Sequence, residues 1–159
     1  MTCVLYPGSF DPIHNGHVEL AETASGLFDE VVVAALVNPS KGDGLFGLEE
    51  RMHLIEESLK HLPNLRTTKF NGLVVDLASE IGADFIIKGL RAVSDFESEL
   101  QMAQMNTALS GVQTLFLPSA SRSSFLASRL IREVVSLGGD VSQMVPEVVQ
   151  EYLEGKTGS

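Results

Sequence analysis

The chain has 159 residues, 44% of them apolar, and a formal net charge of −10. This length suffices for one domain with its own core, and the acidic balance argues against long nucleic acid as a partner. The longest apolar run, residues 31–37, is too short to span a membrane, and no stretch resembles a signal peptide. A single cysteine, Cys3, excludes a disulfide framework and favours a reducing cytoplasm.

Apolar, strand-like runs alternate with segments of helical periodicity along the chain. Strands are predicted at residues 2–6, 30–37, 65–70, 84–87 and 113–117. Helices are predicted at residues 17–28, 48–62, 73–81, 94–110 and 124–137, with a last helix from Pro146. The alternation predicts an α/β fold: a single domain over residues 1–154, with a doubly wound, parallel five-stranded sheet and C-terminal helices, and a flexible tail at 155–159.

The strand order expected for such a sheet is 3-2-1-4-5, and this order predicts where a ligand binds. Ligands bind past the carboxyl ends of the strands where the order reverses, which is between the first and fourth strands. The loops after these strands are residues 9–17 and 88–91, so we expect the two loops to lie side by side. In the fourth predicted helix, Met102, Met105 and Leu109 are spaced as a core-facing stripe.

The first of these loops lies in residues 6–17, YPGSFDPIHNGH, which join the first strand to the first helix. Its glycine and prolines keep the turn out of regular structure, and a helix start offers unpaired N–H groups and partial positive charge to an anion. His14 and His17 are three residues apart and can face one small volume. An isolated histidine is more often a capping or packing residue, but this turn favours a phosphate-handling site.

Two segments carry a resemblance to a known family. Residues 14–17, HNGH, resemble the HxGH (or TxGH) signature of the nucleotidyltransferase superfamily. The longer string that includes residues 7–12, PGSFDP, is similar to the bacterial phosphopantetheine adenylyltransferases. Residues 88–106, KGLRAVSDFESELQMAQMN, resemble that family's second long motif. The resemblance runs over residues 4–152.

A third segment, residues 123–129, only partly follows the family pattern. Ala127 replaces a serine there and Arg129 replaces a hydroxyl residue, while Ser128 keeps the middle hydroxyl. In similar enzymes these hydroxyls and backbone N–H groups touch the phosphates of ATP, so Arg129 is expected either to contact phosphate itself or to point to solvent.

The resemblance implies a reaction in which ATP and 4′-phosphopantetheine give 3′-dephospho-coenzyme A and pyrophosphate. The attacking phosphate oxygen is already ionised, so positioning and electrostatic stabilisation suffice and no general base is needed. The resemblance also implies Mg²⁺ on the triphosphate, a homohexamer built from trimers, and feedback binding of coenzyme A. The implied catalytic residues are His17, Lys41 and Arg91. The implied ATP-binding residues are Ser9, Phe10, His17, Gly89, Leu90, Arg91, Glu99, Ser123, Ser124, Phe125, Leu126, Ala127, Ser128 and Arg129. The implied residues for the second substrate are Ser9, Lys41, Val74 and Lys88.

Simpler interpretations exist for several of these residues. Lys41 also fits a solvated loop, Val74 a core position, and Glu99 an acid that complements a helix dipole. Residues 42–47 match G-x-G-x-x-G, but no acid closes the third strand, so we interpret them as a flexible loop. Two other functions stay open: a nicotinate-mononucleotide adenylyltransferase, or a non-catalytic adenine-nucleotide sensor of the same fold. A cytidylyltransferase is a more distant alternative.

Overall fold

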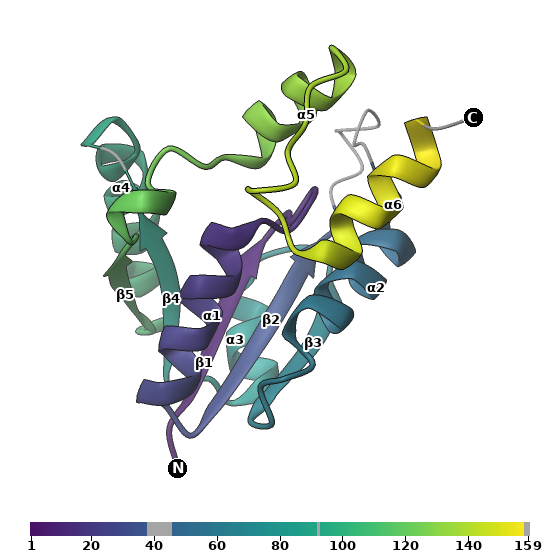
Figure 1. Ribbon diagram of the computed structural model, residues 1–159. Helices are drawn as coiled ribbons and strands as arrows, with labels where there is room; N and C mark the ends of the chain where they lie inside the picture. Colours follow the sequence, from purple (N-terminus) through teal and green to yellow (C-terminus); the bar gives the residue numbers. More distant parts are fainter. Residues whose placement is uncertain (38–45, 92, 158–159) are drawn as a thin grey trace.

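The computed structural model describes residues 1–37, 46–91 and 93–157, and its centre is a parallel β-sheet (Figure 1). The order β3-β2-β1-β4-β5 is the one predicted. Each of the five strands begins within one residue of its predicted start. The strands are β1 (Cys3–Gly8), β2 (Glu30–Leu36), β3 (Leu65–Phe70), β4 (Phe85–Leu90) and β5 (Gln113–Pro118).

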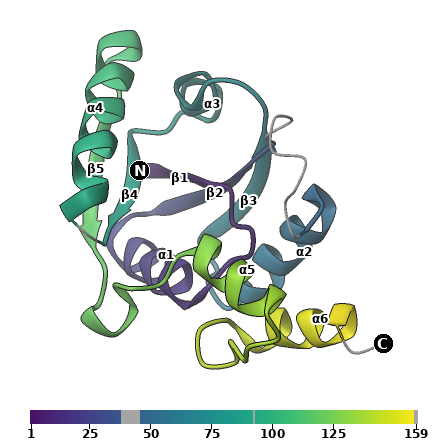
Figure 2. The ribbon, with the colours of Figure 1, turned by 90° about the horizontal axis from the view of Figure 1, so that it is seen from above.

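Helices cover both faces of the sheet. Seen from above, α1, α2, α5 and α6 lie on one side, and α3 and α4 on the other (Figure 2). The helices are α1 (Asn15–Leu27), α2 (Leu48–Leu59), α3 (Val74–Ile81), α4 (Val93–Ser110), α5 (Ser128–Ser136) and α6 (Glu147–Thr157), with a short 3₁₀ helix η1 (Ser121–Ser123). None of the helices in the described residues is long and apolar enough to cross a membrane.

Two apolar clusters, one on each face, hold these layers together. Strand β2 is buried from Val31 to Ala35 because both of its faces are covered. Val31 and Val33 pack in the cluster beneath α1, whereas Val32 and Ala34 pack in the cluster beneath α3. Because side chains alternate along a strand, one continuous apolar run contributes residues to both clusters.

The sheet opens at the predicted switch point. Strand β1 pairs with β2 along all six of its residues, but with β4 only at Val4↔Phe85 and Leu5↔Ile86. Beyond these two pairs the carboxyl halves of β1 and β4 are not paired with each other. The loops that follow both strands therefore border a crevice, as the topology predicts.

Three predictions from the sequence differ from the structure. The helix after β5 begins at Ser128 rather than Ser124, because residues 121–127 form η1 and a turn that cross above the β1–α1 loop. Helix α6 continues through Gly155 to Thr157, where a mobile tail was expected; Lys156 forms an ion pair with Glu50 at 3.1 Å.

The third difference is on α4, where the stripe expected to face the core is exposed. Met102, Met105 and Leu109 are each more than half exposed. Helical spacing of apolar residues shows only that they share a face, and it does not identify what covers that face.

Candidate active site

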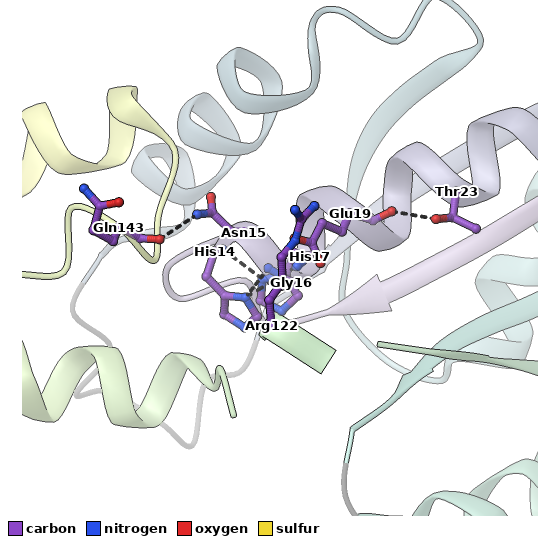
Figure 3. A network of polar contacts seen from close by, with 8 residues as sticks. All are labelled: His14, Asn15, Gly16, His17, Glu19, Thr23, Arg122 and Gln143. Atoms are coloured by element: carbon purple, nitrogen blue, oxygen red, sulfur yellow. Dashed lines mark hydrogen bonds and ion pairs between the residues drawn. The ribbon is translucent and has the colours of Figure 1, made fainter. Parts of the chain in front are cut away.

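The start of α1 is closed by its own two histidines. His14 is the N-cap, and its Nδ1 accepts the N–H of Gly16 at 3.0 Å and of His17 at 3.4 Å. In return, Nδ1 of His17 accepts the N–H of His14 at 3.1 Å. This is a capping box in which histidines take the places of serine and glutamate. Figure 3 shows the two rings against the helix start.

The closure corrects one expectation from the sequence. A helix start was expected to offer unpaired N–H groups to an anion. Instead, the N–H of Asn15 bonds to Met144 O at 2.9 Å, and Val18 makes the first intrahelical bond to His14 O. With Gly16 and His17 capped as well, all four groups are satisfied within the protein. An anion here meets side chains and the helix dipole rather than open backbone donors.

The same bonds assign the tautomer of His17. Because Nδ1 accepts a hydrogen bond, the proton of the neutral ring lies on Nε2. The two imidazoles stack with centroids 3.7 Å apart and planes at 22°. Burial lowers the pKa of His14 to about 3, and burial, His14 and Arg91 together lower the pKa of His17 well below its usual value. Both rings are therefore neutral at pH 7, and His17 is a hydrogen-bond donor rather than a cation.

Aromatic packing fixes the ring of His17 from the other side. The Phe10 ring meets it edge-on at 4.8 Å and also meets Tyr6 at 5.3 Å. Phe10 itself adopts φ 48°, a left-handed conformation that is costly for a residue with a side chain. Gly8 allows this arrangement, because a Cβ there would stand 3.0 Å from the Phe10 ring. Strain and close packing thus hold the catalytic candidate in one orientation.

Three long-range hydrogen bonds bring the η1–α5 segment to this turn. Ser128 Oγ donates to Pro12 O at 2.8 Å, and Arg132 donates to Asp11 O at 2.7 Å. Arg91, from the end of β4, donates to the carbonyl of Leu126. These bonds place the start of α5 opposite the start of α1. Arg132 carries a charge into the site that the sequence analysis did not assign to it.

The start of α5 differs from that of α1 because it is open. Its N-cap is Ala127, which has no side chain that can accept a hydrogen bond. Within the described residues, no acceptor bonds the backbone N–H of Ser128, Arg129 or Leu130. Three orphan donors and the positive end of a helix dipole are what an anion requires.

A cleft of about 1190 Å³ lies between these elements. The predicted site residues that line it are Ser9, Phe10, His17, Lys88, Gly89, Arg91, Ser124, Phe125, Ala127, Ser128 and Arg129. The structure therefore brings the β1–α1 loop, the end of β4 and the start of α5 around one volume. Five of the chain's eleven Lys and Arg residues line it: Lys88, Arg91, Arg122, Arg129 and Arg132. A local excess of cations in an acidic protein suits a polyanionic ligand.

Other predicted residues lie beside or away from the cleft. Ser123 and Leu126 line an adjoining pocket, and Glu99 stands 3.7 Å from the ammonium of Lys88. Leu90 ends β4. Val74 begins α3 on the opposite face of the sheet and packs against the cluster there. Lys41, like most of the glycine-rich segment after it, lies outside the described residues.

Arg51 is a residue that no motif of the sequence singles out. From α2, its guanidinium donates to Ser9 O at 2.6 Å and to Leu36 O at 3.1 Å. It thereby ties the loop after β1 to the end of β2. These carbonyls are far from Arg51 in the sequence, so only the fold shows that they lie within its reach.

The fold is a doubly wound α/β sheet, and the cleft lies at its switch point, where sheets of this kind bind ligands. The cytidylyltransferase-like family model matches residues 5–134, so the chain belongs to that family of nucleotidyltransferases. A candidate nicotinate-nucleotide adenylyltransferase from Vibrio parahaemolyticus is similar in structure, with a TM-score of 0.67 and 17% identity, over 96% of this chain and 99% of that one. A lipopolysaccharide core biosynthesis protein from Thermoplasma volcanium has a TM-score of 0.55 and 22% identity, over 76% of this chain and 97% of that one.

Proposed function

We propose that the protein transfers the adenylyl group of ATP to 4′-phosphopantetheine, giving 3′-dephospho-coenzyme A and pyrophosphate. The observation that carries the proposal is that His17 and Arg91 line the same cation-rich cleft. The motifs at residues 14–17 and 88–106 supply those two residues. Membership of the nucleotidyltransferase family supports the class of reaction, and the resemblance of the two motifs supports the choice of substrates.

In the proposed reaction, a phosphate oxygen of 4′-phosphopantetheine attacks the α-phosphorus of ATP. A new phosphorus–oxygen bond forms, and the bond from the α-phosphorus to the bridging oxygen breaks, so pyrophosphate leaves with the electron pair. The neutral His17 ring donates its Nε2 proton as a hydrogen bond to the charge that builds on the α-phosphoryl oxygens. Arg91 adds a positive charge beside it, and neither group has to transfer a proton.

The remaining predicted residues divide between the two substrates. We assign the β- and γ-phosphates of ATP to the open start of α5 and to Arg129, which forms no ion pair or hydrogen bond with the described residues. The phosphate of 4′-phosphopantetheine is assigned to Lys88 and Lys41, whereas the packing of Val74 in the apolar cluster favours the core position that the sequence also allowed for it. Because Glu99 competes for the ammonium of Lys88, substrate phosphate has to displace or share that contact.

Mg²⁺ is part of the proposal as the counter-ion of the triphosphate. The described residues contain no group of three histidine, cysteine, aspartate or glutamate side chains placed to hold a metal ion. Magnesium often keeps several waters and binds through substrate phosphates rather than through a protein cage. We therefore assign its ligands to phosphate oxygens and water, where it would neutralise charge on the leaving pyrophosphate.

We also propose that the protein acts in the cytoplasm as a homohexamer that coenzyme A inhibits in the same cleft. The exposed stripe of Met102, Met105 and Leu109 on α4 lies next to the edge strand β5, and it supplies apolar surface that self-association would cover. Light scattering of the purified chain tests the hexamer, and a monomer at micromolar concentration would contradict it.

Pyrophosphate release tests the reaction. The protein is incubated with Mg²⁺ and ATP together with either 4′-phosphopantetheine or nicotinate mononucleotide, and mass spectrometry identifies the product. We expect release that depends on 4′-phosphopantetheine, and a product heavier than it by one adenylyl group. Release with nicotinate mononucleotide alone would establish the other adenylyltransferase instead. ATP binding without release for either acceptor would indicate a nucleotide sensor.

A further inference from the structure

The carboxylate of Glu19 on α1 is only half satisfied. Its Oε1 accepts from Arg122 Nε at 3.2 Å, and Figure 3 shows the two side chains together. Its Oε2 is buried and has no hydrogen-bond partner among the described residues. Leaving a buried carboxylate oxygen without a donor is costly, so native structures rarely keep one unless a ligand or water meets it.

The position of Glu19 indicates which kind of ligand could donate a hydrogen bond to Oε2. It lines the main cleft and also a second pocket of about 440 Å³ on the flank of α1. Asn15, Val18 and Glu19 share the helix face that borders this pocket, at spacings of three and four residues. Phe125, Leu126 and Met144 give it apolar walls. The pocket is large enough for a flat heterocycle, and it adjoins the cleft assigned to the phosphates.

We propose that Glu19 recognises the exocyclic amine of the nucleobase, with Arg122 as its positioning residue. This inference rests on the nucleotidyl-transfer function proposed above, since the nucleoside triphosphate brings the base. An amine donates to Oε2, whereas a carbonyl at the same ring position would face a negative oxygen. Adenine and cytosine both carry such an amine, and the pocket volume favours the larger adenine.

Arg122 is suited to positioning because most of its side chain lies in solvent at the edge of the pocket that it helps to line. Its side chain is 81% exposed, whereas that of Glu19 is 25% exposed. Its bond to Oε1 leaves Oε2 as the buried oxygen of the carboxylate that has no partner among the described residues. The pair also joins η1 to α1, the two elements from which Arg122 and Glu19 line the pocket.

Calorimetry of nucleotide binding tests the inference, using pairs of nucleotides that differ only in the exocyclic amine of the base. ATP is compared with purine riboside triphosphate, and CTP with pyrimidin-2-one riboside triphosphate; each analogue lacks only the amine. For the wild-type protein, loss of the amine from ATP is expected to weaken binding at least about tenfold, as for a hydrogen bond to a charged group. Equal binding of ATP and its analogue by the wild type would overturn the proposal whether or not any variant folds.

Substitution of Glu19 tests whether this residue is the one that reads the amine. Glu19→Met removes both acceptor oxygens at similar length, and it should reduce the ratio between ATP and its analogue to about one. Glu19→Gln keeps one neutral acceptor and should leave an intermediate ratio. Glu22→Met is the matched control, because Glu22 is exposed and lines both cavities, and it should keep the wild-type ratio. A Glu19→Met protein that still prefers ATP as strongly as the wild type would refute the role.

The binding measurements with ATP, CTP and their analogues, together with the assay of pyrophosphate release, distinguish failure of this proposal from failure of the proposed function. Amine-dependent binding without pyrophosphate release would keep the role of Glu19 and overturn the adenylyl transfer. Release of pyrophosphate with no dependence on the amine would do the reverse. A larger amine effect with CTP than with ATP would keep the role of Glu19 and identify cytosine as the base that it reads.

Discussion

Two helices begin at the same cleft, and their N-termini are built in opposite ways. The start of α1 is closed, because His14 and His17 satisfy its N–H groups and stack on each other. The start of α5 is open, because Ala127 cannot cap it. A closed end holds a side chain rigidly where charge develops, and an open end offers backbone donors to charge that is already present. In the proposed function, this difference fits transition-state stabilisation by the start of α1 and ground-state phosphate binding by the start of α5.

The largest expected effect is at the closed end, from His17→Ala. Loss of one preorganised donor to the developing charge should lower kcat by roughly 10²–10³. KM for ATP should change much less, because the proposed function assigns the phosphates to the start of α5. Steady-state pyrophosphate release measures both constants. His53→Ala, at an exposed position on α2, is the control, and it should keep full turnover. A folded His17→Ala protein with undiminished kcat would remove this assignment.

His14→Thr is expected to change acid stability. The pKa of His14 is lowered from about 6.5 to about 3 in the folded protein, so the unfolded chain binds a proton that the folded chain does not. Stability from this group is present above pH 6.5 and is lost as pH falls toward 3. Between pH 7.5 and 5 the wild type should lose about 2 kcal/mol more than the variant.

Urea unfolding at the two pH values measures this difference. Threonine is also an N-cap residue, so the variant keeps the cap of α1. The ionisation of groups that do not touch His14 cancels in the comparison, and the pKa of His17 stays lowered in both proteins because burial is its largest cause. Equal acid sensitivity of the wild type and His14→Thr would show that His14 is protonated in the folded state, and would contradict the neutral stacked pair.

The two helix starts also differ in how well the sequence predicts them: the cap of α1 is local in sequence, whereas the start of α5 depends on distant residues. The histidine capping contacts of α1 join residues two or three positions apart, so the string HNGH contains them, whereas the bond from Asn15 N to Met144 O lies outside it. The contacts that set α5 join residues 116 and 121 positions apart, Ser128 to Pro12 and Arg132 to Asp11. No local pattern records such contacts, and the start of that helix was misplaced by four residues.

A sheet with helices on both faces was also predictable, because its signal lies within one short segment. Strand β2 is a continuous apolar run, and only a sheet covered on both faces buries such a run. The role of Glu19 and Arg122 was not predictable, because a glutamate on an amphipathic helix is usually solvated. Its buried oxygen becomes visible only once η1 is placed against α1.

A smaller effect is expected from closing the open end with Ala127→Asp. The new carboxylate can cap α5, which should raise the free energy of unfolding by about 1 kcal/mol. It should also weaken ATP binding by about tenfold, because it occupies the donors and repels phosphate. Thermal unfolding and calorimetry give the two quantities.

Ala127→Asn separates the two causes of weaker binding. Asparagine caps as well as aspartate but carries no charge, so it should stabilise α5 equally and weaken ATP binding less. Stabilisation of the protein with unchanged ATP affinity in both variants would show that the start of α5 does not bind phosphate.

The smallest expected effect is no effect at all, in the pH dependence of kcat between pH 7 and 8.5. The pKa of His17 is held well below 6.5 by burial and by the neighbouring His14 and Arg91, so the ring stays neutral and keeps its Nε2 proton throughout this range. A cationic histidine of ordinary pKa would instead lose its positive charge about tenfold per pH unit, and kcat would fall with it. A flat profile in pyrophosphate release therefore separates a neutral donor from an imidazolium. A steady alkaline decline would mean that the closed end of α1 contributes a charge rather than a hydrogen bond, and the contrast with α5 would no longer hold.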